Sequence, residues 1–231
     1  MRIVGITDLH GNYQKINKIL VHKPDVLVIS GDITHFGKDL RVIDYLKYLK
    51  KNSNIKIFAI PGNCDSEEVI NEINGMGINL DGWIINIEGV YFIGLGGSNI
   101  TPFNTPNEYT EEEIYLKFKN TVKKVKKEDL INKFVLISHT PPYNTMADRV
   151  NNNNVGSTSI RRIIEEYSPS LVVCGHIHES RCIDKIGNSY IVNPSPRSFF
   201  ISDIFIEKYG DKKENREVAV VTVKALELID Y

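Results

Sequence analysis

Three apolar runs in the first sixty residues each lead into a polar segment and then into a helical pattern. The runs are Ile3 to Thr7, Val26 to Ile29 and Ile55 to Ile60. Each run is typical of a buried strand, and helical segments follow. Successive strand–helix units require right-handed crossovers, so they predict a parallel sheet with helices outside it. No other feature of the sequence restricts the fold as strongly.

The rest of the chain changes to a pattern of neighbouring strands. Residues 83–87 and 90–95 are expected to form two adjacent strands, and residues 134–137 a further buried one. Four more strands are expected toward the C-terminal end, at residues 181–186, 190–193, 199–207 and 217–228. The last two form a hairpin that turns at residues 210–213. This α/β pattern predicts two sheets packed face to face with helices on both outer sides.

Two longer segments connect the strands of the second half. Residues 110–129 predict one helix, whose apolar stripe includes Phe118 and Val122 and whose lysine cluster at residues 123–127 forms a solvated face. Residues 144–156 have no periodicity, and we expect them to form a mobile surface loop.

The composition describes one globular domain without a strong electrostatic field. A chain of 231 residues with 42% hydrophobic content can bury one substantial core, so we expect a single domain over residues 1–231. Lys+Arg number 28 and Asp+Glu 29, a balance that argues against a nucleic-acid or membrane-surface partner. Three cysteines argue against a disulfide framework, and no apolar run nears the roughly 20 residues of a membrane span. With no room for a signal peptide before Ile3, we expect a cytoplasmic protein, for which homo-oligomer formation stays open.

Polar side chains with metal-binding chemistry stand at the ends of five predicted strands. They are Asp8, His10, Asp32, Asn63, His139, His176 and His178. Parallel strands bring their carboxyl ends to one edge of a sheet, and two histidines spaced two residues apart project to the same side of an extended segment. Two carboxylates, one carboxamide and four imidazoles suit a pair of borderline divalent ions. One bridging carboxylate can hold such ions about 3.5–4 Å apart, where a shared water becomes a nucleophile.

Each of these residues also has an ordinary structural explanation when it is taken alone. Asp8 is compatible with a helix cap, Asp32 with a turn and His139 with a satisfied core histidine. Their joint occurrence at strand ends favours the metal site.

In this order the residues resemble the calcineurin-like metallophosphoesterase family. The family pattern is matched by Asp8-Leu9-His10, Gly31-Asp32, Gly62-Asn63-Cys64-Asp65, His139 and Gly175-His176-Ile177-His178. The resemblance implies a four-layer α/β/β/α sandwich of two mixed sheets and a hydrolase for a small phosphate-ester substrate. It also implies one ion bound by Asp8, His10 and His178, a second bound by Asn63, His139 and His176, and Asp32 as the bridge. Manganese is the expected metal, with iron, zinc, nickel and cobalt as alternatives.

Cys64 stands where most of the family carries a histidine that protonates the leaving group or steadies the transition state. A thiol with a pKa of about 8.5 is mostly protonated at neutral pH, but it donates a weaker hydrogen bond than an imidazolium. The run from Gly62 to Ser66 also resembles a subgroup of small bacterial and archaeal phosphodiesterases with cysteine at this place. We keep Cys64 with Asp32, Asn63 and His139 as candidate catalytic residues, without a covalent role. The plainer alternative is a small side chain that only packs.

The favoured function is hydrolysis of a phosphate ester, more specifically a diester, by in-line attack of a hydroxide that bridges two divalent ions. The alternatives are a phosphomonoesterase or nucleotidase, a mononuclear metal hydrolase for another substrate, and a protein-binding scaffold like the retromer subunit that resembles this fold. Phosphoprotein phosphatase activity is disfavoured, because arginines that such relatives carry after two motifs are here Ile33-Thr34 and Asp65-Ser66.

The sequence contains further candidates for substrate contact. Tyr143 and Asn144 directly follow the His139 motif and are expected to line the substrate entrance. Arginines near loops are usually solvated, so Arg149, Arg161 and Arg197 are weaker candidates for binding a phosphate.

Overall fold

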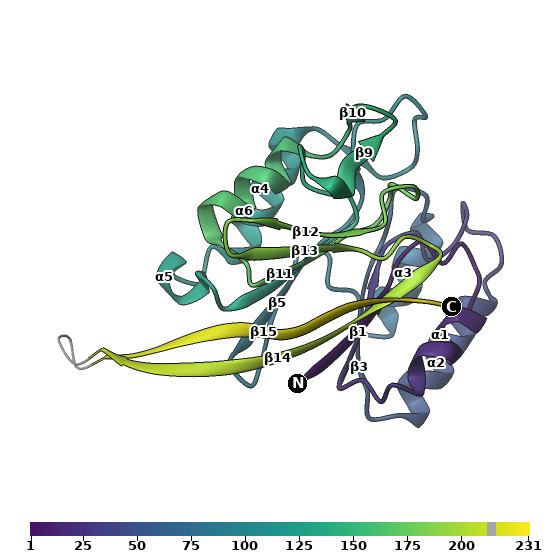
Figure 1. Cartoon of the computed structure of the whole chain (residues 1–231). Helices are drawn as coiled ribbons and strands as arrows, with labels where there is room; N and C mark the ends of the chain where they lie inside the picture. Colours follow the sequence, from purple (N-terminus) through teal and green to yellow (C-terminus); the bar gives the residue numbers. More distant parts are fainter. Residues whose placement is uncertain (212–215) are drawn as a thin grey trace.

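Two large mixed β-sheets lie face to face, and helices cover their outer sides (Figure 1). The computed structural model describes residues 1–211 and 216–231. In Figure 1, α1 (Gln14–Leu20) and α2 (Arg41–Asn52) lie on one outer side, and α4 (Glu111–Val122) and α6 (Thr158–Tyr167) on the other. The predicted α/β fold, a four-layer α/β/β/α sandwich, is confirmed.

The first sheet is built on the three predicted strand–helix units and has the strand order β15-β14-β1-β2-β3. β1 (Arg2–Ile6), β2 (Val26–Ser30) and β3 (Lys56–Ile60) run parallel to one another. α3 (Glu67–Gly75) follows β3, and Ser66 is its N-cap: the Ser66 side chain accepts a hydrogen bond from the Val69 backbone N–H. The C-terminal hairpin of β14 (Ser198–Asp211) and β15 (Arg216–Asp230) adds two antiparallel strands beside β1, and Figure 1 shows it projecting beyond the neighbouring strands.

The second sheet has the strand order β12-β13-β11-β8-β5-β4. Its inner strands are parallel: β5 (Val90–Leu95), β8 (Phe134–Ser138), β11 (Leu171–Val173) and β13 (Ser189–Asn193). The edge strands β4 (Ile84–Ile87) and β12 (Cys182–Ile186) are antiparallel to their neighbours. A small separate sheet pairs β6 (Ser98–Asn99) with β7 (Glu108–Tyr109).

The continuous apolar runs of the strands divide into three cores because successive side chains point to opposite faces. In β2, Val26 and Val28 face the core between the two sheets, whereas Leu27 and Ile29 face the core under the helices of the first sheet. β8 repeats this arrangement toward the helices of the second sheet. A strand with both faces buried has no polar alternation, which explains why these runs are apolar throughout.

The segment expected as one helix over residues 110–129 is divided in two. α4 begins with a capping box of Thr110 and Glu113 and ends at Val122, and α5 (Lys127–Leu130) is a separate turn. The prediction was wrong because the chain turns within the lysine cluster, whose lysines are all exposed, before it enters β8.

The segment 144–156, expected as an irregular loop, has regular structure. It contains a 3₁₀ helix η1 (Met146–Asp148) and the paired strands β9 (Arg149–Val150) and β10 (Asn153–Asn154). The fully buried Asp148 carboxylate accepts hydrogen bonds from the backbone N–H groups of Asn144, Thr145 and Gly156 at 3.0, 2.9 and 3.0 Å. The prediction failed because a buried carboxylate, and not an apolar period, organises this segment.

The predicted C-terminal hairpin is confirmed by the pairing of β14 with β15. The turn predicted at residues 210–213 falls partly on residues 212 and 213, which lie outside the described residues. No helix within residues 1–211 and 216–231 is long and apolar enough to cross a membrane.

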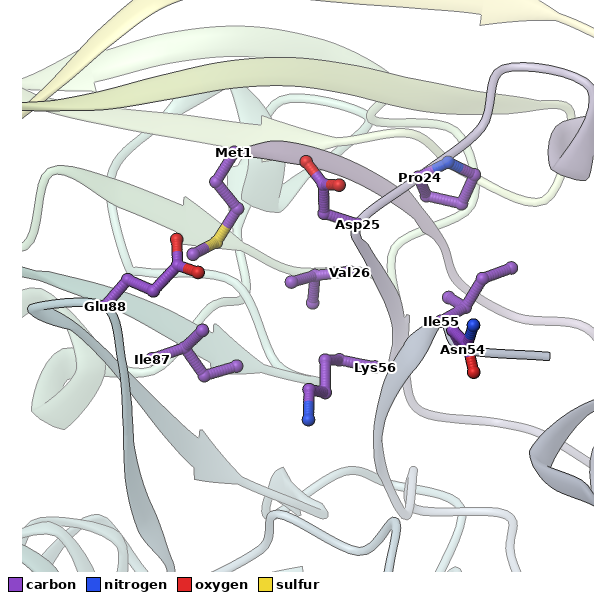
Figure 2. Close-up of a pocket in the computed structure, with 9 residues that line it drawn as sticks. All are labelled: Met1, Pro24, Asp25, Val26, Asn54, Ile55, Lys56, Ile87 and Glu88. Atoms are coloured by element: carbon purple, nitrogen blue, oxygen red, sulfur yellow. The ribbon is translucent and has the colours of Figure 1, made fainter.

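A pocket lies at the end of the first sheet that is opposite to the polar motifs. This pocket of about 440 Å³ is lined by Met1, Val26 and Lys56 at the starts of β1, β2 and β3, and Figure 2 shows Glu88 facing it from the second sheet. A five-residue strand spans roughly 16 Å, so the motifs lie at the opposite edge. The pocket therefore shares no residue with the seven candidate ligands.

Truncating Phe92 tests the core between the sheets. Phe92 is fully buried, and its ring lies 5.1 Å from that of Phe58. Phe92→Ala should lower the free energy of unfolding by about 3–5 kcal/mol in urea denaturation, because it leaves a cavity that the two sheets cannot close. Phe103, which is 80% exposed, is the matched control, and Phe103→Ala should change stability by less than about 0.5 kcal/mol. Equal effects of the two substitutions would contradict this description of the core.

Candidate metal centre

All five polar motifs directly follow strands, and the two sheets contribute to the same place. Loops after β1, β2 and β3 carry Asp8, His10, Asp32 and Asn63, and loops after β8 and β11 carry His139, His176 and His178. The seven candidate ligands come together although they extend over residues 8–178. Ligand atoms of Asp8, His10 and His178 lie within 4.8 Å of one another, and so do those of Asp8, Asp32 and His139.

The first group surrounds one oxygen of Asp8. His178 Nε2 lies 3.3 Å from Asp8 Oδ1 and 3.4 Å from His10 Nε2. Asp8 is fully buried, yet its Oδ1 has no hydrogen-bond partner. A buried carboxylate oxygen without a donor is unfavourable unless a cation binds to it.

His139, Asn63 and His176 form the second group of candidate ligands, and it contains two acceptor atoms that face each other. His139 Nδ1 lies 2.8 Å from the Ser30 carbonyl, which can only accept, so the hydrogen-bond network assigns the proton of the neutral ring to Nδ1. The other ring nitrogen, Nε2, then presents its lone pair 2.9 Å from Asn63 Oδ1. His176 stands beside this pair, with its ring centroid 5.1 Å from that of His139. Two lone pairs directed at each other are the arrangement of ligands around a cation.

Asp32 lies between the two groups. Its Oδ1 is 3.4 Å from His139 Nε2 in the second group, and its Oδ2 is 3.9 Å from His10 Nε2 in the first. One carboxylate thus offers an oxygen to each group, which is the geometry that a bridging ligand needs.

The protonation of the groups suits metal binding. Burial alone would raise the pKa of Asp8, but the neighbouring His178 and His139 lower it to about 2. Burial lowers the pKa of His176 to about 4, and burial also lowers the pKa of His10. The neighbouring Asp8 carboxylate raises the pKa of His178. At neutral pH the centre therefore holds a charged Asp8 and at least two neutral imidazoles, which are the forms that bind metals.

Four of the seven residues have a left-handed backbone. The φ angles of Asp8, His10, Asp32 and His176 are 50°, 45°, 48° and 67°. Non-glycine residues adopt this conformation at a cost of order 1–3 kcal/mol, and such residues cluster at functional sites. Backbone hydrogen bonds from Asp8 to Gly31 and from His10 to Asp32 hold the first two loops in this geometry.

Two motif glycines let the loops approach one another. A Cβ on Gly62 would lie 2.0 Å from Asp32 Oδ1, and a Cβ on Gly175 would lie 1.8 Å from the hydroxyl oxygen of Thr7 and 2.7 Å from Asp8 Oδ2. All three distances are too short for any side chain. The glycines are therefore required for the carboxylates to reach their places.

The sequence profile of the calcineurin-like phosphoesterase family matches residues 1–180, which include all seven candidate ligands. The chain belongs to this family. The uncharacterized protein MJ1162 of Methanocaldococcus jannaschii is 53% identical over 208 residues, which cover 88% of this chain and 92% of the relative.

Solved structures share the fold of this calcineurin-like phosphoesterase at low identity. The protein TT1561 of Thermus thermophilus is 15% identical with a TM-score of 0.67, and the match covers 94% of this chain and 97% of that one. A dimetal phosphatase from Danio rerio is 12% identical with a TM-score of 0.61, over 100% of this chain and 99% of that one. These likenesses support the four-layer fold.

The family binds divalent metal ions, and the residues of this member fit them. The donor set contains only carboxylate and carboxamide oxygens and imidazole nitrogens, which bind borderline divalent ions. The unpartnered Asp8 Oδ1 and the facing lone pairs of His139 and Asn63 are the atoms that such ions would satisfy.

Three residues that the sequence did not single out position the candidate ligands of this phosphoesterase. The buried Asp65 accepts hydrogen bonds from the backbone of Ile33, Thr34 and Gly62 at 3.1, 2.8 and 2.9 Å, which ties the loop after β2 to the loop after β3. Its place in the Gly-Asn-Cys-Asp motif was the available signal.

Thr105 and Glu108 orient the Asn63 carboxamide. The Thr105 hydroxyl donates to Glu108 at 2.6 Å and accepts from Asn63 Nδ2 at 2.9 Å, so Asn63 must direct its oxygen toward His139. Partial burial opposes ionisation of Glu108, but the hydrogen bonds of Thr101 and Thr105 lower its pKa to about 2, which keeps this acceptor charged. No motif marks these residues in the sequence.

Cys64 lies beside the centre without reactive character. Its backbone N–H donates to Asp32 Oδ1 at 3.0 Å, and its thiol accepts weakly from Asn63 Nδ2 at 3.5 Å. Burial and the neighbouring Asp32 raise the pKa of the thiol, so it stays protonated.

The remaining candidates lie on the loop after β8 and its surroundings. Arg161 forms an ion pair with Glu165 at 2.6 Å and donates a hydrogen bond to the Asn144 carbonyl at 3.2 Å. Its guanidinium is therefore bound to protein groups and is not a free ligand for phosphate. Arg149 is exposed and lines a pocket of about 630 Å³, whose lining also includes Glu179, the residue that follows His178. Arg197 is exposed and directly precedes β14. Tyr143 is 41% exposed, so its ring is accessible to a ligand.

Gly62→Ala should weaken binding of Mn²⁺ at least about 10-fold in isothermal titration calorimetry, because the added methyl group displaces Asp32. Gly75→Ala is the matched control, since a Cβ on this helical glycine meets nothing within 4 Å. The control should bind Mn²⁺ like the unchanged protein and gain a few tenths of a kcal/mol in stability. Unchanged metal binding in Gly62→Ala would refute the proposed place of Asp32.

Thr105→Val tests the orientation of Asn63. Removing the hydroxyl frees the carboxamide to rotate, so the affinity for the Mn²⁺ ion that Asn63 would bind should fall about 10-fold. Thr105→Ser keeps the hydroxyl and should retain most of the affinity. If Val and Ser variants bind Mn²⁺ equally well, Thr105 does not position Asn63.

Proposed function

We propose that the chain is a dinuclear metal-dependent hydrolase of phosphate esters, with phosphodiesters as its substrates and Mn²⁺ as its metal. The observation that carries this proposal is the position of Asp32, whose two oxygens face two separate groups of ligand atoms. We assign Asp8, His10 and His178 to one ion and Asn63, His139 and His176 to the other, with Asp32 between them. The relationship to a family of phosphoesterases supports the reaction class.

A pair of divalent ions supplies positive charge for the phosphoryl oxygens and lowers the pKa of a water molecule to near neutrality. The residues of the chain have three tasks in this reaction. Asp32 and Asp8 would hold the ions through their negative charge. His139, fixed through Ser30, and Asn63, fixed through Thr105, maintain the geometry, and the Cys64 N–H holds one Asp32 oxygen.

The charges around the centre favour a diester over a monoester. Within the described residues, no arginine side chain forms a hydrogen bond or ion pair with any of the seven candidate ligands. A monoester dianion carries a second charge that such sites commonly neutralise with an arginine, whereas a diester carries one. We expect the second ester group to contact the exposed Tyr143, which follows the His139 motif.

A single domain over residues 1–231 and a cytoplasmic location complete the proposal. Both ends of the chain belong to the same sheet, because β14 pairs with β1, and this supports a single domain. The free, buried cysteines Cys64, Cys174 and Cys182 suit a reducing compartment.

The proposal is tested by loading the metal-free protein with Mn²⁺, Ni²⁺, Co²⁺, Zn²⁺ or Mg²⁺ and assaying p-nitrophenyl phosphate against bis(p-nitrophenyl) phosphate. We expect two ions per chain, the highest activity with Mn²⁺ and a higher kcat/KM for the diester. Asp32→Asn should lower kcat/KM more than about 10²-fold, since the bridge loses its charge. Asp203→Asn, which removes the charge of a half-buried partner of Arg2, serves as the control and should keep full activity.

Two outcomes would replace the proposal. Metal-loaded protein that hydrolyses neither ester would favour the scaffold alternative, and one ion per chain would favour a mononuclear hydrolase.

A further inference from the structure

The loop between β2 and α2 places an imidazole beside the candidate metal centre that is not one of the seven candidate ligands. The His35 ring meets the His10 ring edge-on, with centroids 5.4 Å apart and planes at 77°. The side chain of His35 is exposed. Within the described residues, its ring contacts His10 and Phe36 and has no hydrogen-bond partner. His35 is therefore a polar ring at the rim of the centre, with both nitrogens available to a ligand.

Hydrogen bonds fix the loop that carries this ring. Phe36 N donates to the Cys64 carbonyl at 3.0 Å, so the loop lies against the loop after β3. Thr34 donates to Asp65 through its backbone and its hydroxyl at 2.8 and 2.9 Å, and Gly37 N donates to the Thr34 hydroxyl at 3.2 Å. These bonds fix the loop backbone, so His35 stands beside the centre before a substrate arrives, which is what contact with a reacting group requires.

The other histidines have other places in the structure, and Cys64 is a poor donor. Of the six histidines, four are candidate ligands, and His22 lies against Phe199 with ring centroids 5.1 Å apart. Cys64 has a buried thiol that donates only weak hydrogen bonds. Among the described histidines, His35 alone borders the centre without being a candidate ligand.

We propose that His35 contacts the substrate and donates a hydrogen bond from its ring N–H to the oxygen of the departing alcohol. This inference rests on the proposed phosphodiesterase function and names a further catalytic residue for it. The imidazole of His35 would then donate the strong hydrogen bond to the leaving oxygen that the thiol of Cys64 cannot donate. The atoms balance with water alone: its oxygen forms the new bond to phosphorus, the bond to the alcohol oxygen breaks, and that oxygen ends with a proton, while His35 is unchanged after the cycle.

This role predicts a dependence on the leaving group. Negative charge develops on the alcohol oxygen as its bond to phosphorus breaks, and a donor stabilises that charge more when the alcohol is a weaker acid. p-Nitrophenol leaves readily without help, whereas unsubstituted phenol needs it. A residue that only binds the phosphate or supports the loop would affect both esters equally.

The experiment measures kcat and KM of the Mn²⁺-loaded protein on methyl aryl phosphates whose phenols range from p-nitrophenol through p-chlorophenol to phenol. His35→Ala should lower kcat about 3-fold for the p-nitrophenyl ester and about 10²-fold for the phenyl ester, with little change in KM. His35→Gln keeps an N–H donor and should recover part of the loss on the phenyl ester. His22→Gln is the matched control and should behave like the unchanged protein.

Mn²⁺ titration calorimetry and the unfolding midpoint provide readouts besides activity. We expect His35→Ala to bind two Mn²⁺ ions with unchanged affinity, since His35 is not a candidate ligand. If His35→Ala does not fold, His35→Gln carries the comparison through its own leaving-group series, in which a loss that grows toward phenol supports the inference.

Three results would overturn the inference while leaving the proposed function intact: an equal loss on all esters, a change in KM alone, or loss of an Mn²⁺ ion from a His35 variant. If the unchanged, metal-loaded protein hydrolyses none of the esters, the proposed function fails and this inference fails with it.

Discussion

The structure depends on a group of electron-rich atoms that the protein leaves without partners of their own. Asp8 Oδ1 is buried without a donor, and the lone pairs of His139 Nε2 and Asn63 Oδ1 face each other at 2.9 Å. Leaving such atoms buried is costly in a protein interior, where each lost hydrogen bond is worth about 1–3 kcal/mol. Binding of cations at the proposed centre would turn this cost into affinity and would link folding to metal binding.

The surrounding structure supports the cluster from two directions. From below, the strands of both sheets end at the same edge, and backbone hydrogen bonds from Asp8 to Gly31 and from His10 to Asp32 interlock the first two loops in a left-handed conformation. From the side, residues outside the ligand set orient the candidate ligands. Asp65 ties two loops together, and Thr105 directs the Asn63 oxygen toward the centre. Orientation of ligands by a second layer of hydrogen bonds is a general requirement of metal sites.

The accuracy of sequence interpretation varied with the range of the interactions involved. The apolar runs and their following motifs predicted β1, β2 and β3, because strand periodicity and burial on both faces are local properties. The helix over residues 110–129 and the irregular loop over residues 144–156 were predicted wrongly. In the first case the chain had to turn toward β8, and in the second a buried carboxylate, Asp148, gathered backbone donors from a segment with no apolar period. Neither cause produces a periodic pattern of apolar residues in the sequence.

The sequence by itself determined the α/β architecture, the strand ends that carry the motifs, and the seven residues whose chemistry suits divalent ions. Only the tertiary structure decided which atoms face one another: that Asp32 divides its oxygens between two groups, that Thr105 directs Asn63, and that His35 stands against His10. The physical reason is that motifs are recognised along the chain, whereas these contacts depend on side-chain direction and on the backbone angles of residues from separate loops.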